Sequence, residues 1–452
     1  MNEMKESTTR MENTDGRDHR DDRNERAVRN EGVRSEGVRN EGVRNESVRN
    51  ESVRNESARN ESVRNGSDGN HSARTRRDGR NERNDRRKNF LVSLLTASFL
   101  VPITAPGAVA RQYKQALPGY QYQFPRDHAS HEDFKTEWWY YTGHMQTENG
   151  KRYGYELTFF RHGIEHDSSL KNGEDRNVYL AHFALTDESA GKFQYFEKMS
   201  RSGLPVAYAR KDILAVQNLG WSVEQLGDRF ILRADGDKSG IRLMLSPVKK
   251  PIIHGKDGVS QKASCKGCAS HYYSMTRLKT EGIVLADGKP ERITSGWSWM
   301  DHEFGSNQLT SEQIGWDWFS VQLDNNTELM LYVMRRRDGT IDKNSSGTII
   351  GADGSTVHMA HDEFKITATS KWTSPNSKGV YPMGWSIDIP KQQIKLTVEP
   401  VSKDQELLTK RSTGVTYWEG SANVSGTANG KAVKGQSYVE MTGYAEAFKK
   451  KI

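Results

Sequence analysis

The first ninety residues of this 452-residue chain contain no tryptophan, no tyrosine and no cysteine. All ten Trp, all seventeen Tyr and both Cys follow residue 110. A segment without large apolar side chains cannot bury enough surface to offset the entropy that folding removes. We therefore expect residues 1–85 to be a disordered arm and the aromatic-rich remainder to hold the core.

The chain also has no segment with a large excess of basic or of acidic residues. Residues 1–90 carry 22 basic and 19 acidic side chains, and the rest of the chain carries 44 and 40. The formal net charge of +7 is therefore spread thinly, because basic and acidic residues alternate throughout. Since no basic patch stands out, the sequence predicts no nucleic-acid partner.

Motifs of several common enzyme classes are also absent. The chain has no H-E-x-x-H pair, no phosphate-binding loop and no G-x-S-x-G turn, so zincin, nucleotide-dependent and α/β-hydrolase chemistry are not predicted. Two cysteines do not supply the roughly four ligands of a structural zinc site. We predict no metal centre and no cofactor.

A five-residue unit repeats through the arm, from Arg29 to about Asn65, as RNEGV, RSEGV and RNESV. Five residues advance a helix by about 140° beyond one turn, so the valines of successive units spiral around it. In a strand an odd period sends them to alternate faces. Neither structure gains a core, which favours disorder; a role as a tether or spacer stays open.

An apolar run at residues 90–101 has the features of an export signal. Basic residues 86–88 precede it, and Ala108-Val109-Ala110 follows as an A-x-A cleavage site. The run is short for a membrane span. We therefore predict a signal peptide at residues 86–110 and an exported protein, periplasmic or secreted. Two alternatives explain the arm in front of it: a downstream start of translation, or a long leader that stays attached as an anchor.

The residues after 110 have the pattern of β-strands. Short β-rich runs alternate with turn signals such as Asn149-Gly150 and Asp338-Gly339, and no long stretch has a helical period. Regular short strands of this kind predict an all-β barrel or sandwich. The clearest runs are RYGYELTFFR (152–161), YLAHFALT (179–186), ELMLYVM (328–334) and QIKLTV (393–398).

The strand pattern occurs twice. WWYYTGHMQ (138–146) matches WDWFSVQLD (316–324), and HYYSMTRL (271–278) matches SYVEMTGY (437–444). Two copies of one β-unit, with a boundary near residues 287–293, are the simplest interpretation. If the closing strand of each unit pairs with its opening strand, each unit forms an antiparallel barrel.

The stretch GWSWMDHEFG (296–305) carries the densest chemistry. Alternate residues of a strand lie on opposite faces. One face would carry Trp297, Trp299, Asp301 and Glu303, and the other Met300 and His302. Aromatic rings beside a carboxyl group make a place where an acid stays protonated or a cation is stabilised. An ordinary buried polar network is the competing interpretation.

These residues resemble the carotenoid 1,2-hydratase-like, or AttH-like, proteins, which are built from two lipocalin-like β-barrel domains. The resemblance implies such domains at residues 111–290 and 291–452. It also implies a hydrophobic small molecule as partner and an ABC-type transporter as a further one. The segments that carry it are HEDFKTEWWYYTGHM (131–145), YGYELTFFR (153–161), AHFALTD (181–187), HYYSMTRL (271–278), GWSWMDHEFG (296–305), the run 315–339, YPMGW (381–385), YWEG (417–420) and YVEMTGY (438–444).

Cys265 and Cys268 lie just before the HYYSMTRL strand. Haem attachment needs a histidine directly after the second cysteine, and here Ala269 stands in that place. In an exported protein the pair favours a local disulfide that closes a tight loop. Adventitious metal binding with His254 and His271 is the minor alternative.

The resemblance implies residues for the hydration of a C=C bond. This reaction needs a strong acid, a wall that tolerates a carbocation and a placed water. Asp301 would be the acid, Trp299 the wall, and His302 or Tyr273 the partner of the water. The alternation of a strand puts His302 opposite Asp301, which counts against joint action unless the strand bulges there.

The mouth of a barrel, or the junction between two barrels, is a usual place for a small-molecule site. Further residues are expected to contact a ligand there: His131, Glu137, Trp138, Tyr140, Trp297 and Glu303. Structural roles compete with this. Trp138 fits a barrel core, Glu137 fits an ion pair with Arg161 or Arg277, and His182 fits a core histidine.

Three functions therefore compete. The favoured one is an exported protein that binds a hydrophobic or amphipathic molecule of lipid or terpenoid class, with peripheral contact to a membrane left open. The alternative is a hydro-lyase that protonates a C=C bond with Asp301. The third is a purely structural pair of barrels, in which the GWSWMDHEFG stretch only joins the two.

Overall fold

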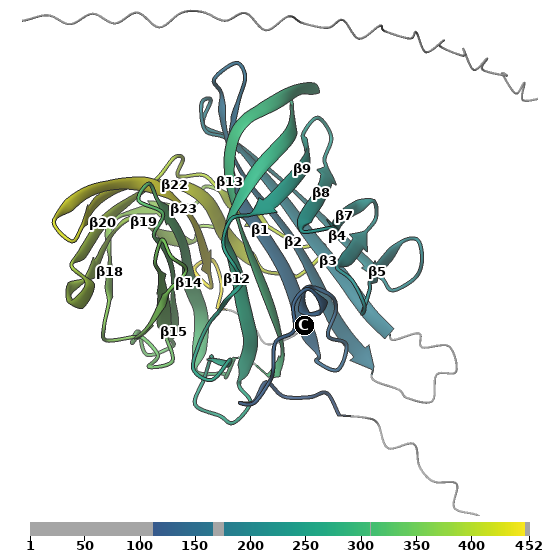
Figure 1. Cartoon of the computed structure of the whole chain (residues 1–452), viewed down its shortest axis with the longest axis horizontal. Coiled ribbons are helices and arrows are strands. Elements are labelled where there is room, and N and C mark those ends of the chain that lie inside the picture. Colours follow the sequence, from purple (N-terminus) through teal and green to yellow (C-terminus); the bar gives the residue numbers. More distant parts are fainter. Residues whose placement is uncertain (1–111, 166–175, 308, 448–452) are drawn as a thin grey trace, which may run out of the picture. The chain divides into compact units, whose positions relative to one another are not determined.

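The computed structural model describes residues 112–165, 176–307 and 309–447, all within one compact unit of residues 99–452. The predicted arm and signal peptide lie outside the described residues. The described part is almost entirely β-structure and consists of two antiparallel, barrel-like sheets (Figure 1). This confirms the predicted fold class. No helix of the described residues has the length and hydropathy of a membrane span.

The first sheet contains thirteen strands from the first half of the folded region. They are β1 Thr136–Thr147, β2 Arg152–Glu165, β3 Arg176–Asp187, β4 Lys192–Arg201, β5 Ala207–Ala209, β6 Ala215–Asn218, β7 Trp221–Leu226, β8 Arg229–Asp235, β9 Gly240–Pro247, β10 Ile252–Ile253, β11 Ser260–Gln261, β12 Ala269–Ala286 and β13 Lys289–Asn307. Their order is β4-β3-β2-β1-β13-β12-β9-β8-β7-β6-β5, and β10 and β11 pair with β12. A short 3-10 helix, η1 Arg126–His128, precedes β1.

The second sheet contains ten strands. They are β14 Gln313–Leu323, β15 Glu328–Arg336, β16 Ser346–Ile350, β17 Thr356–Ala360, β18 Lys365–Thr373, β19 Val380–Ile389, β20 Ile394–Pro400, β21 Glu406–Leu408, β22 Thr416–Ala428 and β23 Lys431–Thr442, with the 3-10 turn η2 Pro390–Gln392 before β20. Their order is β17-β16-β15-β14-β23-β22-β20-β19-β18, and β21 pairs with β22.

The GWSWMDHEFG stretch lies in β13 and belongs wholly to the first sheet, because β13 pairs with β1 on one side and β12 on the other. From the sequence we expected the domain boundary near residue 290, which would put this stretch at the start of the second barrel. The structure instead puts it in the first sheet. Asp287 and Gly288 have positive φ angles of 49° and 78°, as a two-residue hairpin turn requires. The turn signal there is thus the β12–β13 hairpin, and the change of sheet comes between Asn307 and Gln313.

The two sheets repeat one arrangement. β1, β13 and β12 stand side by side in the first sheet as β14, β23 and β22 do in the second. The predicted pairing of an opening with a closing strand occurs between β14 and β23. In the first sheet β13 takes that place, so HYYSMTRL of β12 is not the counterpart of SYVEMTGY. Tyr and Thr are enriched in strands generally, which explains the false match.

Three apolar clusters make up most of the core. The first lies within the first sheet and includes Trp139 and Met300. The second lies within the second sheet and includes Phe319 and Trp385. The third contains residues of both sheets, among them Trp299 and Trp318. It therefore joins the two sheets, and its residues lie on the face of each sheet that is opposite that sheet's own core.

Candidate ligand site between the two sheets

A cavity of about 570 Å³ lies where the two sheets meet. Aromatic rings from both sheets form much of its wall: Trp138, Tyr140 and Tyr272 from the first sheet, and Trp316, Trp318 and Tyr332 from the second. Three carboxyl groups also line it, those of Asp301, Glu303 and Glu440. A volume of this size is typical of small-molecule pockets, which usually combine apolar walls with a few polar groups.

The alternation of β13 places its polar residues on two different faces. Asp301 and Glu303 line the cavity. Met300 belongs to the core of the first sheet, and His302 stacks on Trp139 of that core at 4.9 Å between ring centroids. The predicted division of the strand is therefore confirmed, and β13 has no register shift against β1 at these positions.

Asp301 is buried, and all of its hydrogen-bond donors are neutral. Tyr272 Oη donates to Oδ2 at 2.7 Å, and Trp299 Nε1 donates to Oδ1 at 2.6 Å. The Ser274 hydroxyl donates to Oδ1 as well. Burial raises the pKa of Asp301 to about 7, although these three hydrogen bonds oppose the rise. A carboxyl group in this state exchanges its proton near neutral pH, as a general acid requires.

Glu303, two residues further along β13, is held by a charge instead. Lys262 Nζ lies 3.0 Å from Glu303 Oε2, and the lysine also sits over the rings of Tyr272 and Tyr332, at 5.0 and 4.5 Å. The Lys262 side chain is 9% exposed. This lysine was not predicted as a site residue, because it comes from an irregular loop whose position no strand pattern indicates.

Glu440 brings a third carboxyl group to the cavity, from β23 of the second sheet. The Trp316 side chain donates a hydrogen bond to it, and burial raises its pKa to about 7 against that hydrogen bond. Glu440 was not among the predicted site residues. The signal that points to it is the register of the repeat: Tyr140 lies opposite Asp301 in the first sheet, and Trp318 lies opposite Glu440 in the second.

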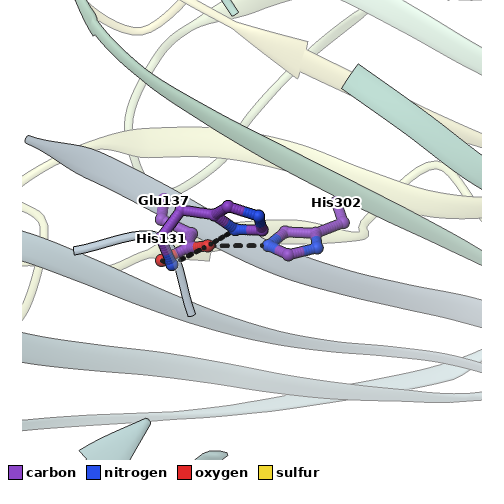
Figure 2. A group of neighbouring side chains, drawn as sticks. All are labelled: His131, Glu137 and His302. Atoms are coloured by element: carbon purple, nitrogen blue, oxygen red, sulfur yellow. Dashed lines mark hydrogen bonds and ion pairs between the residues drawn. The ribbon is translucent and has the colours of Figure 1, made fainter. Parts of the chain in front are cut away.

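On the other face of β1 and β13, Glu137 lies in a network of hydrogen bonds and charges. Its Oε1 is 2.8 Å from His131 Nδ1 and 2.9 Å from His302 Nε2, as Figure 2 shows. Arg161 Nε donates to Oε2 at 3.0 Å, and Ser130 Oγ does so at the same distance. Burial opposes ionisation, but the hydrogen bonds from both histidines and the charge of Arg161 hold the pKa of Glu137 well below its usual range.

His131, Glu137 and His302 have donor atoms that all lie within 4.8 Å of one another. Their arrangement nevertheless fits a hydrogen-bonded network around the Arg161–Glu137 ion pair better than a metal centre. One oxygen of Glu137 already accepts from both imidazoles, and the Arg161 guanidinium lies against the other. A cation would have to replace these shared protons and approach a buried positive charge.

The predicted water partners lie on this second face too. Tyr273 Oη is 2.7 Å from His128 Nδ1 and 3.0 Å from His302 Nδ1, all within the core of the first sheet. The structure therefore does not bring His302 or Tyr273 to Asp301, nor His131 or Glu137 to its side of the sheet. The catalytic and binding roles themselves stay predictions.

Of the remaining predicted site residues, Trp138 and Tyr140 line the cavity. Trp299 packs in the cluster between the sheets and bonds to Asp301. Trp297 contacts Arg277, whose guanidinium carbon is 5.3 Å from a ring centroid. Tyr140 donates a hydrogen bond to Glu419 of the second sheet.

His182, interpreted as a core histidine, is buried, and its two ring nitrogens lie 2.7 Å from Tyr417 Oη and 2.8 Å from Ser412 Oγ. Both ring nitrogens thus have partners, although the side chain also borders the cavity. The pair Cys265 and Cys268 forms a disulfide, with the Cα atoms 5.3 Å apart. The backbone N–H of Lys262 donates to Cys268 O at 2.9 Å. The disulfide loop therefore helps to fix the backbone of Lys262, whose side chain lines the cavity.

Comparison with known proteins agrees with this architecture. The model of a family described as AttH-like matches residues 115–444. The chain is similar to the solved structure of a protein provisionally assigned as AttH from Nitrosomonas europaea, with 31% identity and a TM-score of 0.66 over 73% of this chain and 99% of that chain. It shares its fold with kievitone hydratase from Nectria haematococca, at 15% identity and a TM-score of 0.57 over 75% of this chain and 98% of that chain.

No curated protein matches the sequence. The family model, however, spans both sheets and the cavity between them, and the Nitrosomonas protein is matched over almost its whole length. This chain therefore belongs to the AttH-like family.

Proposed function

We propose that this protein binds a hydrophobic or amphipathic small molecule, of lipid or terpenoid class, in the cavity between its two sheets. The observation that carries the proposal is the cavity of about 570 Å³ with aromatic walls from both sheets. Ligand sites are usually concave and mostly apolar, with a small number of placed polar groups. A structural junction would gain more stability if side chains filled this space.

The polar groups of the cavity suit a ligand that is mostly apolar. Lys262 and Glu303 neutralise each other at 3.0 Å, so they add no net charge to the wall. Burial raises the pKa of Asp301 to about 7 and that of Glu440 to about 7 as well, so burial disfavours the charged form of both carboxyl groups. An apolar ligand therefore meets little of the desolvation cost that a charged wall would impose.

A second candidate function is the addition of water to a C=C bond, or its reverse. The position and protonation of Asp301 favour it, because this group lies in the cavity and exchanges its proton near pH 7. Trp299 donates to the carboxyl group at 2.6 Å and fixes its orientation. Kievitone hydratase, which shares the fold, is named for chemistry of this kind, but Asp301 and the cavity are what support it here.

Extraction of the natively produced protein with organic solvent, followed by untargeted mass spectrometry, tests the binding proposal. We expect a near-stoichiometric apolar compound from the wild type. Leu309→Trp puts a large side chain at the cavity wall, so its extract should lose the compound. Val357→Trp, at a residue that is 45% exposed, is the matched control and should keep it. Equal amounts of the compound in all three proteins would refute binding in this cavity.

Export by the segment at residues 86–110 stays a prediction, as does a transporter partner. Cell fractionation with an antibody against the folded region tests the first. Recovery of the protein in the cytosol with an intact leader would contradict it.

A further inference from the structure

In the structure, Asp301 lies apart from His302 and Tyr273, the residues predicted to bind the water for hydration. His302 and Tyr273 lie on the opposite face of the sheet, bonded to each other at 3.0 Å. A group that deprotonates water, or that accepts a hydrogen bond from a ligand hydroxyl, must border the cavity itself. The carboxyl groups that do so are those of Glu303 and Glu440.

Glu303 is poorly suited to this role, because its charge is already bound by Lys262 at 3.0 Å. Glu440 has no ion pair within the described ranges of the chain, and its donor is the neutral indole of Trp316. It occupies in β23 the position that Asp301 occupies in β13, each opposite an aromatic residue of the opening strand. The two carboxyl groups thus reach one cavity from two different sheets.

We propose that Glu440 is the second ligand-contacting acid–base group of the cavity, and that Asp301 and Glu440 together select apolar ligands that carry a hydroxyl group. This inference rests on the proposed function and assigns the chemistry of its ligand. A hydroxyl group both donates and accepts a hydrogen bond. In the state with Asp301 protonated and Glu440 ionised, Asp301 donates to the oxygen of the hydroxyl group and Glu440 accepts its proton.

The same pair completes the hydration step without any other reactant than water. The proton of Asp301 goes to one alkene carbon, and the oxygen of water bonds to the other carbon. That water then transfers one of its protons to the Glu440 carboxylate. The product is an alcohol, Asp301 becomes ionised and Glu440 protonated, and exchange with solvent restores the starting state. Dehydration follows the reverse path.

Other titratable groups surround Glu440. Those within electrostatic reach are Asp301 and Glu303 of β13, Glu156 of β2, Glu419 and Tyr417 of β22, Tyr140 of β1 and Lys262. Burial raises the pKa of Glu156 to about 8 and that of Glu419 well above its usual range. Both therefore stay largely protonated at pH 7, and Glu303 is paired with Lys262. Asp301 is thus the acid whose ionisation changes the charge next to Glu440.

Two probes of similar size test the inference: 2-naphthol, which has the hydroxyl group, and 2-methylnaphthalene, which lacks it. Fluorescence titration of the full chain between pH 5 and pH 8.5 gives both dissociation constants. We expect the wild type to prefer 2-naphthol about tenfold near pH 7, the effect of one or two buried hydrogen bonds. The preference should fall toward pH 5, where both carboxyl groups are protonated, and toward pH 8.5, where both are ionised.

Glu440→Met should reduce the preference to about twofold or less while the affinity for 2-methylnaphthalene stays within a factor of two. Glu440→Asp, which restores a carboxyl group, should recover most of it. Asp317→Asn removes another carboxyl of the second sheet, one that is bonded to Arg335 and Tyr444 rather than lining the cavity. This control should leave the preference unchanged.

The outcomes separate the two proposals. If neither probe binds the wild type, both the ligand site and the role of Glu440 are refuted. If both probes bind but Glu440→Met keeps the tenfold preference, the role of Glu440 is refuted and the ligand site stands. If Glu440→Met does not fold, the pH profile of the wild type decides, because a preference that is flat from pH 5 to pH 8.5 contradicts the pair.

Discussion

Asp301 and His302 are neighbours in one strand, yet they belong to two regions with opposite electrostatics. On the face toward the second sheet, Asp301 receives hydrogen bonds from neutral donors only, and its pKa is raised to about 7. On the face toward the first core, Glu137 receives them from two histidines and Arg161, and its pKa is well below the usual range. Both carboxyl groups are buried.

The comparison shows that burial alone does not decide the state of a carboxyl group. Burial disfavours the charge at both sites, and only partners with positive charge or imidazole protons overcome it. The Glu137 network therefore holds β1, β2 and the segment around His131 together. The Asp301 face keeps a titratable proton beside a cavity, which is the state that binding and proton transfer can use.

The largest effect on stability should follow from removing the charge of Glu137. Glu137→Gln leaves the buried Arg161 without its counter-ion, and such a loss costs about 3–5 kcal/mol. Urea unfolding followed by tryptophan fluorescence measures it. Asp301→Asn, which removes no counter-ion, should cost far less. Equal losses for the two variants would contradict the conclusion that Glu137 is ionised beside a buried counter-ion and that Asp301 is not.

The two faces should also respond to pH with opposite signs. Native Asp301 keeps its proton up to about pH 7, whereas the unfolded chain releases it above the usual value of 3.8. The free energy of unfolding of the wild type therefore decreases through this group as pH rises from about 4 to 7, whereas that of Asp301→Asn has no such contribution. The melting temperature of Asp301→Asn relative to the wild type should rise over this range and then level off.

Glu137 provides the reverse case for the same measurement. Its depressed native pKa stabilises the fold above the usual value of 4.5, and this contribution disappears as pH falls toward the native pKa. The deficit of Glu137→Gln should therefore shrink in acid. A deficit that is constant from pH 3 to pH 8 would argue against an ionised Glu137.

A smaller loss of stability is expected from removing the Cys265–Cys268 disulfide. The double variant Cys265→Ser with Cys268→Ser opens a loop with a sequence separation of three, and chain-entropy estimates for so short a loop give about 2 kcal/mol or less. Because Cys268 O accepts a hydrogen bond from the backbone N–H of Lys262, loss of the disulfide should shift Lys262, and probe binding should weaken even where the melting temperature hardly changes. Unchanged binding would show that the loop does not position this lysine.

The sequence predicted the all-β fold, the division of β13 into two faces and the local disulfide, because all three depend on residues close together in the chain. It did not predict Glu440, since Asp301 and Glu440 meet only after two distant strands of different sheets come together. It chose Tyr273 over Tyr272, although Tyr272 is the one bonded to Asp301. Tyr272 lies opposite Glu303 and Tyr273 opposite His302, so the two tyrosines lie on different faces of the sheet. The resemblance that suggested Tyr273 did not indicate which face it occupies.

The difference between the two faces is tested most directly by the protonation states of Asp301 and Glu137. Infrared difference spectra, recorded as wild type minus Asp301→Asn and wild type minus Glu137→Gln, isolate the carbonyl stretch of each protonated group across pH 4 to 9. We expect a protonated-carboxyl band for Asp301 that disappears around pH 7, and no such band for Glu137 at any pH in this range. An ionised Asp301 at pH 5, or a protonated Glu137 at pH 6, would contradict this difference between the two faces.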